Sequence, residues 1–301
     1  MNIIPDLMYD REKLRSQIKK WKWLFFVVLA MLFVSLAQKN SSKAIKHDYI
    51  ARINIVGFIG YDTDLIKKLK TLESDSSVKA VIVHIDSPGG TTFGGEELYL
   101  ALKKLSLIKP VVSVIETMGA SGGYMVALAS NYIIAANMSI TGSIGVIAHN
   151  YELVELAKKL GIKFENFKSS PLKAAPNPFE DTTSEVKSAQ MELVNDSYEI
   201  FLDMLMKNRK MTRAQALKVA DGKVYLGKRA KDLKLIDAIG GEEEAIIWLE
   251  SNKKISSKIP VEEITWYPKE TFLDEVKKFL HYGNDALVKV LNQGSYQILA
   301  K

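Results

Sequence analysis

The 301-residue chain contains no cysteine and only four histidines. The absence of cysteine excludes disulfide bonds, catalysis by a thiolate and zinc sites built on cysteine. Acidic residues are scarce near the N-terminus, where the first 50 residues carry nine Lys/Arg against four Asp/Glu and so hold five of the six net positive charges. A nucleic-acid-binding domain usually spreads basic charge over its folded surface, so this distribution argues against nucleic acid as a partner.

Long apolar runs are also missing, with one exception. Residues 23–37, WLFFVVLAMLFVSLA, contain no charge and follow a basic segment. A membrane-spanning helix needs about 20 apolar residues and at least ~17, and Trp21 and the stem of Lys22 extend the usable length at the interface. The heavier positive charge before the run predicts a cytoplasmic N-terminus and a main domain on the outer side.

We therefore expect a cytoplasmic basic tail (1–22), a transmembrane signal anchor (23–37) and a polar linker (38–48), with the protein in the inner membrane of a bacterial-type cell. The alternative is a signal peptide cleaved near the small residues Ser35 and Ala37. A leader of 22 residues before the apolar core is long for a cleaved peptide, which favours the anchor.

After the linker, short apolar runs alternate with helical patterns. VKAVIVHI (78–85) is typical of a buried strand, and DTDLIKKLKTLESD (62–75) of an amphipathic helix. Further strands are expected at 53–60, 110–116, 131–138 and 261–268, and helices at 94–105, directly after Ser121, at 152–160 and at 183–220. This alternation predicts an α/β fold with a mostly parallel sheet and helices on both faces.

We expect this domain to cover residues 49–250 and a C-terminal extension to cover 251–301. The extension carries apolar residues at helical spacing, which is typical of core or subunit-contact surface: Phe272, Leu273, Val276, Phe279 and Leu280.

The five small residues Gly119-Ala120-Ser121-Gly122-Gly123 lie between a predicted strand and a predicted helix. Free backbone N–H groups at a helix start favour developing negative charge, and small neighbours let a substrate carbonyl approach closely. Ser121 is therefore a candidate nucleophile. A serine at this position is also a common helix N-cap, and this stretch alone does not decide between the two.

A second glycine motif, IDSPGGTT (85–92), follows another buried strand. The N–H groups of Gly89 and Gly90 are candidate oxyanion donors, together with that of Gly122. The carboxyl ends of parallel strands are where open α/β folds place their sites. The phosphate-binding patterns G-x-x-x-x-G-K-[ST] and G-x-G-x-x-G are both absent.

The residues around Ser121 also fit G-x-S-x-G, the nucleophile elbow of α/β-hydrolases, which requires an acid and then a histidine downstream. His47 lies in the linker, His84 inside a strand, and His149 too close to Ser121 for that order. His281 lies on a peripheral helical segment. A lysine is therefore considered as the base, while an esterase or lipase that uses a histidine stays open.

Four linked motifs resemble the signal peptide peptidase A family of serine peptidases, which belongs to the Clp-protease and crotonase-like group. The resemblance runs in order over about residues 51–245 and includes HIDSPGG (84–90), MGASGGYMVALASNYIIA (118–135), TGSIGVI (141–147) and DGKVYLGKRAKDLKLIDAIGG (221–241). It implies a Clp-protease/crotonase-like fold and a Ser–Lys dyad, with no metal, nucleotide or other cofactor.

The resemblance places the catalytic lysine in KSSPLKAAPNPF (168–179), at Lys173. This stretch departs from the family pattern at Ser170, where a glycine is expected, and at Leu172, where an aromatic residue is expected. Lys168 is the competing candidate. An ordinary lysine is charged at neutral pH and cannot accept a proton, so a lysine base must be desolvated. The alanines and prolines that follow Lys173 favour such an environment.

The resemblance implies a membrane-anchored serine endopeptidase that degrades apolar peptides such as cleaved signal peptides. Family members with one catalytic unit per chain form rings in which the dyad is completed across a subunit boundary. This chain has one serine motif and one lysine motif, so a homo-oligomeric ring is expected. The altered surroundings of Lys173 leave open a catalytically idle membrane scaffold of the same fold.

Overall fold

The computed structural model describes residues 19–31 and 47–265. The chain divides into two compact units, Met1–Asp48 and Tyr49–Lys301. In the first unit, residues 19–31 are helical. None of the helices among the described residues has the length and apolar character needed to cross a membrane. Residues 32–37 of the expected anchor lie outside the described residues, as does the apolar stripe of the C-terminal extension.

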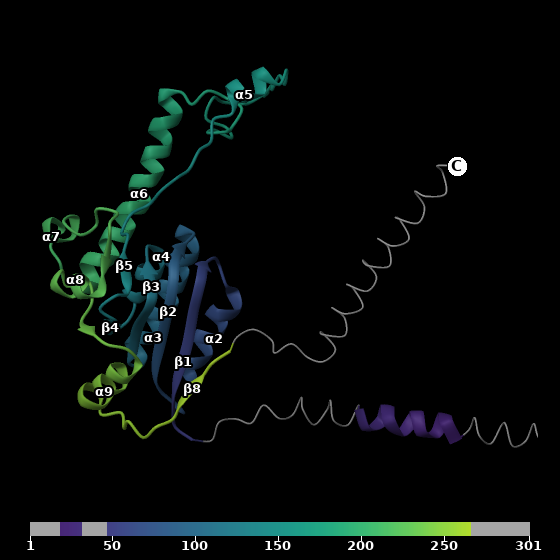
Figure 1. Ribbon diagram of the computed structural model, residues 1–301, viewed down its shortest axis with the longest axis vertical. Helices are drawn as coiled ribbons and strands as arrows, with labels where there is room; N and C mark the ends of the chain where they lie inside the picture. The colour runs from purple at the N-terminus through teal and green to yellow at the C-terminus, as the bar shows by residue number, and fades with distance from the viewer. Residues whose placement is uncertain (1–18, 32–46, 266–301) are drawn as a thin grey trace, which may run out of the picture. The chain divides into compact units, whose positions relative to one another are not determined.

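The second unit is built on an eight-stranded mixed sheet (Figure 1). The strand order is β6-β5-β3-β2-β1-β8, and β4 pairs with β3 and β7. Every pair is parallel except β5–β6. The strands are β1 (Tyr49–Ile59), β2 (Val78–Gly90), β3 (Val111–Ala120), β4 (Tyr132–Ala135), β5 (Ile140–Gly142), β6 (Val224–Leu226), β7 (Ala238–Ile239) and β8 (Val261–Glu263).

Helices follow most of these strands. They are α2 (Thr63–Ser74), α3 (Thr92–Ile108), α4 (Gly122–Ala127), α5 (Val154–Lys159), α6 (Ser184–Arg209), α7 (Arg213–Leu217), α8 (Gly227–Asp232) and α9 (Glu242–Lys253). Local sequence explains their starts: the Asp62 side chain caps α2 by accepting from the N–H groups of Asp64 and Leu65. The buried residues Leu65 and Leu69 then lie on one face of that helix.

The sheet is covered on both faces, because alternate residues of its central strands point to opposite sides. Ile50, Ile82 and Val114 pack with Leu249 of α9 in one buried cluster. The intervening strand residues are also buried, and on the other face α3 and α4 contact β2 and β3. The predicted α/β fold with a mostly parallel sheet is confirmed.

Two predicted elements need correction. The helical pattern over 183–220 forms two helices, because α6 ends at Arg209 and the following residue, Lys210, adopts a left-handed conformation (φ 52°). Thr212 and Gln215 then start α7 through a reciprocal capping box. Among the described residues of the expected strand at 261–268, only Val261–Glu263 form β8.

Candidate active site

Ser121 is held in a strained backbone conformation between β3 and α4. Its dihedral angles are φ 51° and ψ −120°, and its side chain makes no capping hydrogen bond to α4. The Ser121 N–H donates to the Gly142 carbonyl at 2.9 Å, which joins it to β5. A non-glycine residue at positive φ costs about 1–3 kcal/mol and persists only where its surroundings enforce it. The role of helix cap therefore does not explain this serine.

The end of β2 packs directly against Ser121. Gly89 has φ +113°, and a Cβ atom built on it would lie 2.8 Å from the Ser121 Cβ and 2.9 Å from the Gly122 nitrogen. A Cβ on Gly122 would lie 3.1 Å from the Gly90 nitrogen. Only glycine at position 89 allows this approach of the two backbone segments. The structure thus brings Gly89, Gly90 and Gly122 together with Ser121 at the carboxyl edge of the sheet.

Lys173 lies in a different part of the unit. It belongs to residues 146–183, here called the lysine arm, which contain α5 and lead from β5 into α6. Figure 1 shows α5 at the outer end of α6, away from the sheet and from α4. The Lys173 side chain is exposed, and its ammonium group has no ion pair or hydrogen bond with the described residues. Within one chain, the structure does not bring Lys173 to Ser121.

The competing lysine is already engaged inside the lysine arm. Lys168 forms an ion pair with Glu180, and its side chain is only 18% exposed. The hydrogen bond from Lys168, aided by one from Asn166, lowers the pKa of the Glu180 carboxyl. Lys168 is therefore committed to a carboxylate, whereas Lys173 is not.

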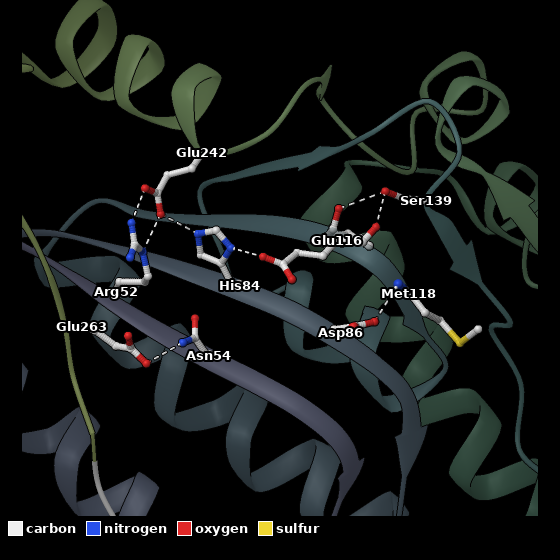
Figure 2. A network of polar contacts seen from close by, with 10 residues as sticks. Arg52, Asn54, His84, Asp86, Glu116, Met118, Ser139, Glu242 and Glu263 are labelled. Carbon is white, nitrogen blue, oxygen red and sulfur yellow. Dashed lines mark hydrogen bonds and ion pairs between the residues drawn. The ribbon is translucent and has the colours of Figure 1, made fainter.

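His84 is bound between two carboxylates on the face of the sheet that carries α9. Its Nδ1 lies 2.6 Å from Glu116 Oε1 and its Nε2 lies 2.7 Å from Glu242 Oε2. Figure 2 shows this row continuing from Glu242 to Arg52. Among the described residues, no histidine is hydrogen-bonded to Ser121. His281 lies outside the described residues.

Composition and periodicity did not reveal the short strands that complete this edge. β5 places the Gly142 carbonyl beside the Ser121 N–H, and the N–H of Ser143 donates to the Lys223 carbonyl at 2.7 Å. Ser143 also has positive φ, at 49°. The one local indication of this structure in the sequence is TGSIG (141–145), where two glycines around a serine indicate irregular backbone. No group of three or more His, Asp or Glu side chains that could hold a metal occurs among the described residues.

A mostly parallel α/β sheet with a strained serine beside two glycines at its carboxyl edge is the arrangement of an α/β serine hydrolase. Residues 103–256 match the model of peptidase family S49. A Methanocaldococcus jannaschii protein named "Putative protease" is 38% identical over 197 residues, which are 65% of this chain and 63% of that protein.

Two other relatives carry more specific names. "Serine protease SPPA, chloroplastic" of Arabidopsis thaliana is 36% identical over 188 residues, 60% of this chain and 27% of that protein. "Putative signal peptide peptidase SppA" of Enterococcus faecium is 30% identical over 200 residues, 66% of this chain and 58% of that protein. The chain spans less than two thirds of each of these three relatives. It belongs to peptidase family S49, the signal peptide peptidase A family of serine peptidases.

Proposed function

We propose that the protein is a membrane-anchored serine endopeptidase in which Ser121 is the nucleophile. The observation that carries the proposal is the strained Ser121 backbone, free of any capping bond, packed against Gly89. The Ser121 Oγ attacks the peptide carbonyl while the Lys173 amine takes its proton. The N–H of Gly122, with that of Gly89 or Gly90, stabilises the oxyanion.

The proton then completes a closed cycle. Lys173 gives it to the departing amine when the peptide C–N bond breaks, which leaves an acyl ester on Ser121. Water attacks this ester, Lys173 takes one proton from the water, and that proton passes to Ser121 Oγ as the ester bond breaks. The product leaves as a carboxylic acid, which then loses its own proton to solvent. Such a cycle needs a base that is neutral before each attack, so Lys173 must be shielded from water when the site is complete.

The proposed substrates are extended apolar peptides such as cleaved signal peptides. A groove of about 570 Å³ supports this class, because it is lined by apolar residues that include Val56, Phe58 and Ile59. Ile59 pairs with Gly90 in the sheet, so the groove begins next to the proposed oxyanion donors. The proposed N-terminal anchor keeps the catalytic domain at the outer side of the membrane, close to such peptides.

We further propose that Lys173 acts on Ser121 of a neighbouring subunit in a homo-oligomeric ring. The lysine arm supports this assembly because it exposes large apolar side chains, among them Tyr151, Leu160 and Phe167. Several large apolar side chains exposed in one segment favour a protein–protein contact surface. A second copy that covers the lysine arm would also remove water from around Lys173.

The experiment that tests the proposal is labelling of the full-length, membrane-extracted protein with a fluorophosphonate. We expect one modified residue, Ser121, and loss of both labelling and peptide cleavage in Ser121→Ala. Ser76→Ala is the matched control, because Ser76 is an exposed serine remote from the site in sequence. It should keep full activity.

The same preparation distinguishes the competing functions. A parent protein that is neither labelled nor active on any apolar peptide would favour the idle scaffold. Activity that survives Lys173→Ala and disappears in His281→Ala would instead favour a histidine-dependent esterase.

A further inference from the structure

The end of β2 is irregular on both of its sides. The register between β1 and β2 shifts between Val56 and Phe58, around Gly57. The register between β2 and β3 shifts between Ile85 and Ser87. Such bulges interrupt the backbone ladder and re-aim a strand, and they are over-represented next to active sites. Pairing with β1 resumes at Phe58–Gly89 and Ile59–Gly90, so the stretch just before the two glycines, at Asp86 and Ser87, is the irregular part that side chains must bridge.

Ser87 makes one of the missing connections. Its hydroxyl donates to the Gly57 carbonyl at 2.6 Å and accepts from the Gly89 N–H at 3.1 Å. Ser87 is completely buried. A Cβ on Gly123 would lie 2.9 Å from the Ser87 carbonyl oxygen, so Ser87 also packs against the start of α4. Ser87 thus joins Gly57 of β1, the candidate oxyanion loop and the start of α4.

Asp86 makes the connection on the other side. Its Oδ1 accepts a hydrogen bond from the Met118 N–H at 3.1 Å, at the break between β2 and β3 (Figure 2). Met118 precedes Ser121 by three residues on β3. The Asp86 carboxylate therefore ties the strand that carries the glycines to the strand that carries the serine.

We infer that Asp86 and Ser87 are positioning residues that fix Gly89 and Gly90 relative to Ser121 by bridging the two bulges. The inference rests on the proposed function of Ser121 as the nucleophile. Neither side chain touches the substrate in this role. Each side chain fixes the direction in which backbone N–H groups point. This direction matters because an oxyanion donor stabilises the transition state only when it is aligned with the developing charge.

The test compares kinetics with folding in Asp86→Ala, Asp86→Asn, Ser87→Ala and Ser87→Cys. Rates are measured on an apolar peptide and divided by the concentration of sites that a fluorophosphonate titrates. The affinity of a peptide boronate, which forms a tetrahedral adduct with the serine, is measured beside KM. Circular dichroism reports the melting temperature of each variant.

We expect kcat to fall roughly 10- to 100-fold in Asp86→Ala and in both Ser87 variants, since small misplacements of catalytic groups cost up to about 10²-fold. KM should change less than about twofold, and boronate affinity should fall in parallel with kcat, because ground-state binding does not use the oxyanion donors. Asp86→Asn should recover most of the rate, because its amide oxygen still accepts from Met118. Ser87→Cys fills the position with a slightly larger side chain and a weaker hydrogen bond, so it tests the role even if Ser87→Ala does not fold.

Ser113→Ala is the matched control. Ser113 is equally buried and bonds to Ser130 at 2.6 Å, but it lies on β3 away from the carboxyl edge. It should lower the melting temperature and leave kcat per titrated site unchanged. The inference is overturned if Asp86→Ala and Ser87→Cys keep the parental kcat per site, or if KM and boronate affinity weaken together. An unlabelled, inactive parent would instead refute the proposed function itself.

Discussion

The surroundings of Ser121 and the lysine arm are opposite kinds of structure in one chain. Around Ser121, backbone segments pack so closely that a methyl group on Gly89 would lie 2.8 Å from the serine Cβ. In the lysine arm, Phe167 is 97% exposed and the Lys173 ammonium group has no partner among the described residues. On the proposed mechanism, one chain therefore completes the nucleophile and its oxyanion donors but not the base.

α6 connects these two regions: its C-terminal half is packed into the body, whereas its N-terminal half is mostly exposed. Its C-terminal half is anchored in the body by Phe201, Leu202 and Leu205, which are buried. Arg209 at its end forms a bidentate ion pair with Asp237, at 2.8 and 2.9 Å. The lysine arm precedes the N-terminal half of this helix, whose only buried residue is Val186. The proposed base therefore lies in a segment that leads into the outer end of a firmly anchored helix, where a neighbouring subunit of the proposed ring would contact it.

The largest expected effect is the loss of the base. Lys173→Ala should lower kcat roughly 10³-fold, within the range that general bases contribute. Lys168→Ala is the matched control in the same arm, and it should stay within a few-fold of the parent because a part-exposed ion pair contributes about 1 kcal/mol or less. Steady-state cleavage of an apolar peptide measures both.

Mixing two inactive proteins tests whether the base crosses the subunit boundary. Ser121→Ala and Lys173→Ala subunits, dissociated and reassembled together, should recover about a quarter of the parental activity if intact sites form at random between neighbours. A dyad within one chain predicts no recovery. That result would refute the conclusion that Lys173 cannot reach Ser121 of its own chain.

The next effect is on stability. Phe201→Ala removes a ring that is 1% exposed in α6 and should lower the free energy of unfolding by about 3–5 kcal/mol. Phe167→Ala removes an equally large ring from the lysine arm and should lower it by less than about 0.5 kcal/mol. Urea unfolding measures both. Sedimentation should show the reverse order for assembly, with weaker oligomers for Phe167→Ala than for Phe201→Ala. Equal losses of unfolding free energy in the two variants would contradict the proposed difference between the body and the lysine arm.

A pair of glycines gives a smaller effect on catalysis. Gly89→Ala should lower kcat about 10²-fold, because the new methyl group displaces Ser121, the proposed nucleophile, or Gly122, a proposed oxyanion donor. Gly161→Ala in the lysine arm has similar backbone strain (φ +70°) but meets nothing within 4 Å. It should lose about 1 kcal/mol of local stability and keep its kcat. Active-site titration with peptide kinetics separates the two outcomes.

The sequence predicted the regular elements and the glycine motifs for a physical reason. Val- and Ile-rich runs such as 78–85 form buried parallel strands, and carboxyl ends of parallel strands meet at one edge. Ser121 and Gly89 therefore had to lie close together. Three-residue strands such as β5 show no periodicity, so they were not predicted. The helix break at Lys210 was hidden because lysine carries no turn signal. The position of the lysine arm is not encoded in local patterns, since several of its large apolar side chains, Phe167 above all, are exposed and do not fix it against the sheet.

The smallest expected effect is on stability at acid pH. It compares a carboxyl group of the body, Asp221, with one of the lysine arm, Glu180. Asp221 lies just before β6, the strand that pairs with β5. Its carboxylate forms an ion pair with Lys223 at 2.8 Å and also accepts hydrogen bonds from the Lys223 N–H and the Tyr225 hydroxyl. These contacts lower the pKa of Asp221 from 3.8 to about 2. The unfolded chain then binds a proton at higher pH than the folded chain, so this stabilisation is present above pH 4 and is lost as the pH falls toward 2. Asp221→Asn should flatten the dependence of the melting temperature on pH in that window.

Glu180 is the counterpart in the lysine arm, where the hydrogen bond from Lys168 lowers its pKa as well. Because the arm packs little against the body, its local opening should not be coupled to global unfolding. Glu180→Gln should therefore leave the acid dependence of the melting temperature as in the parent. Circular dichroism melts between pH 2 and 5 compare the parent with both variants. If Glu180→Gln flattens the curve as much as Asp221→Asn does, the arm melts together with the body, and Lys173, the proposed base, is held far more rigidly than its exposure suggests.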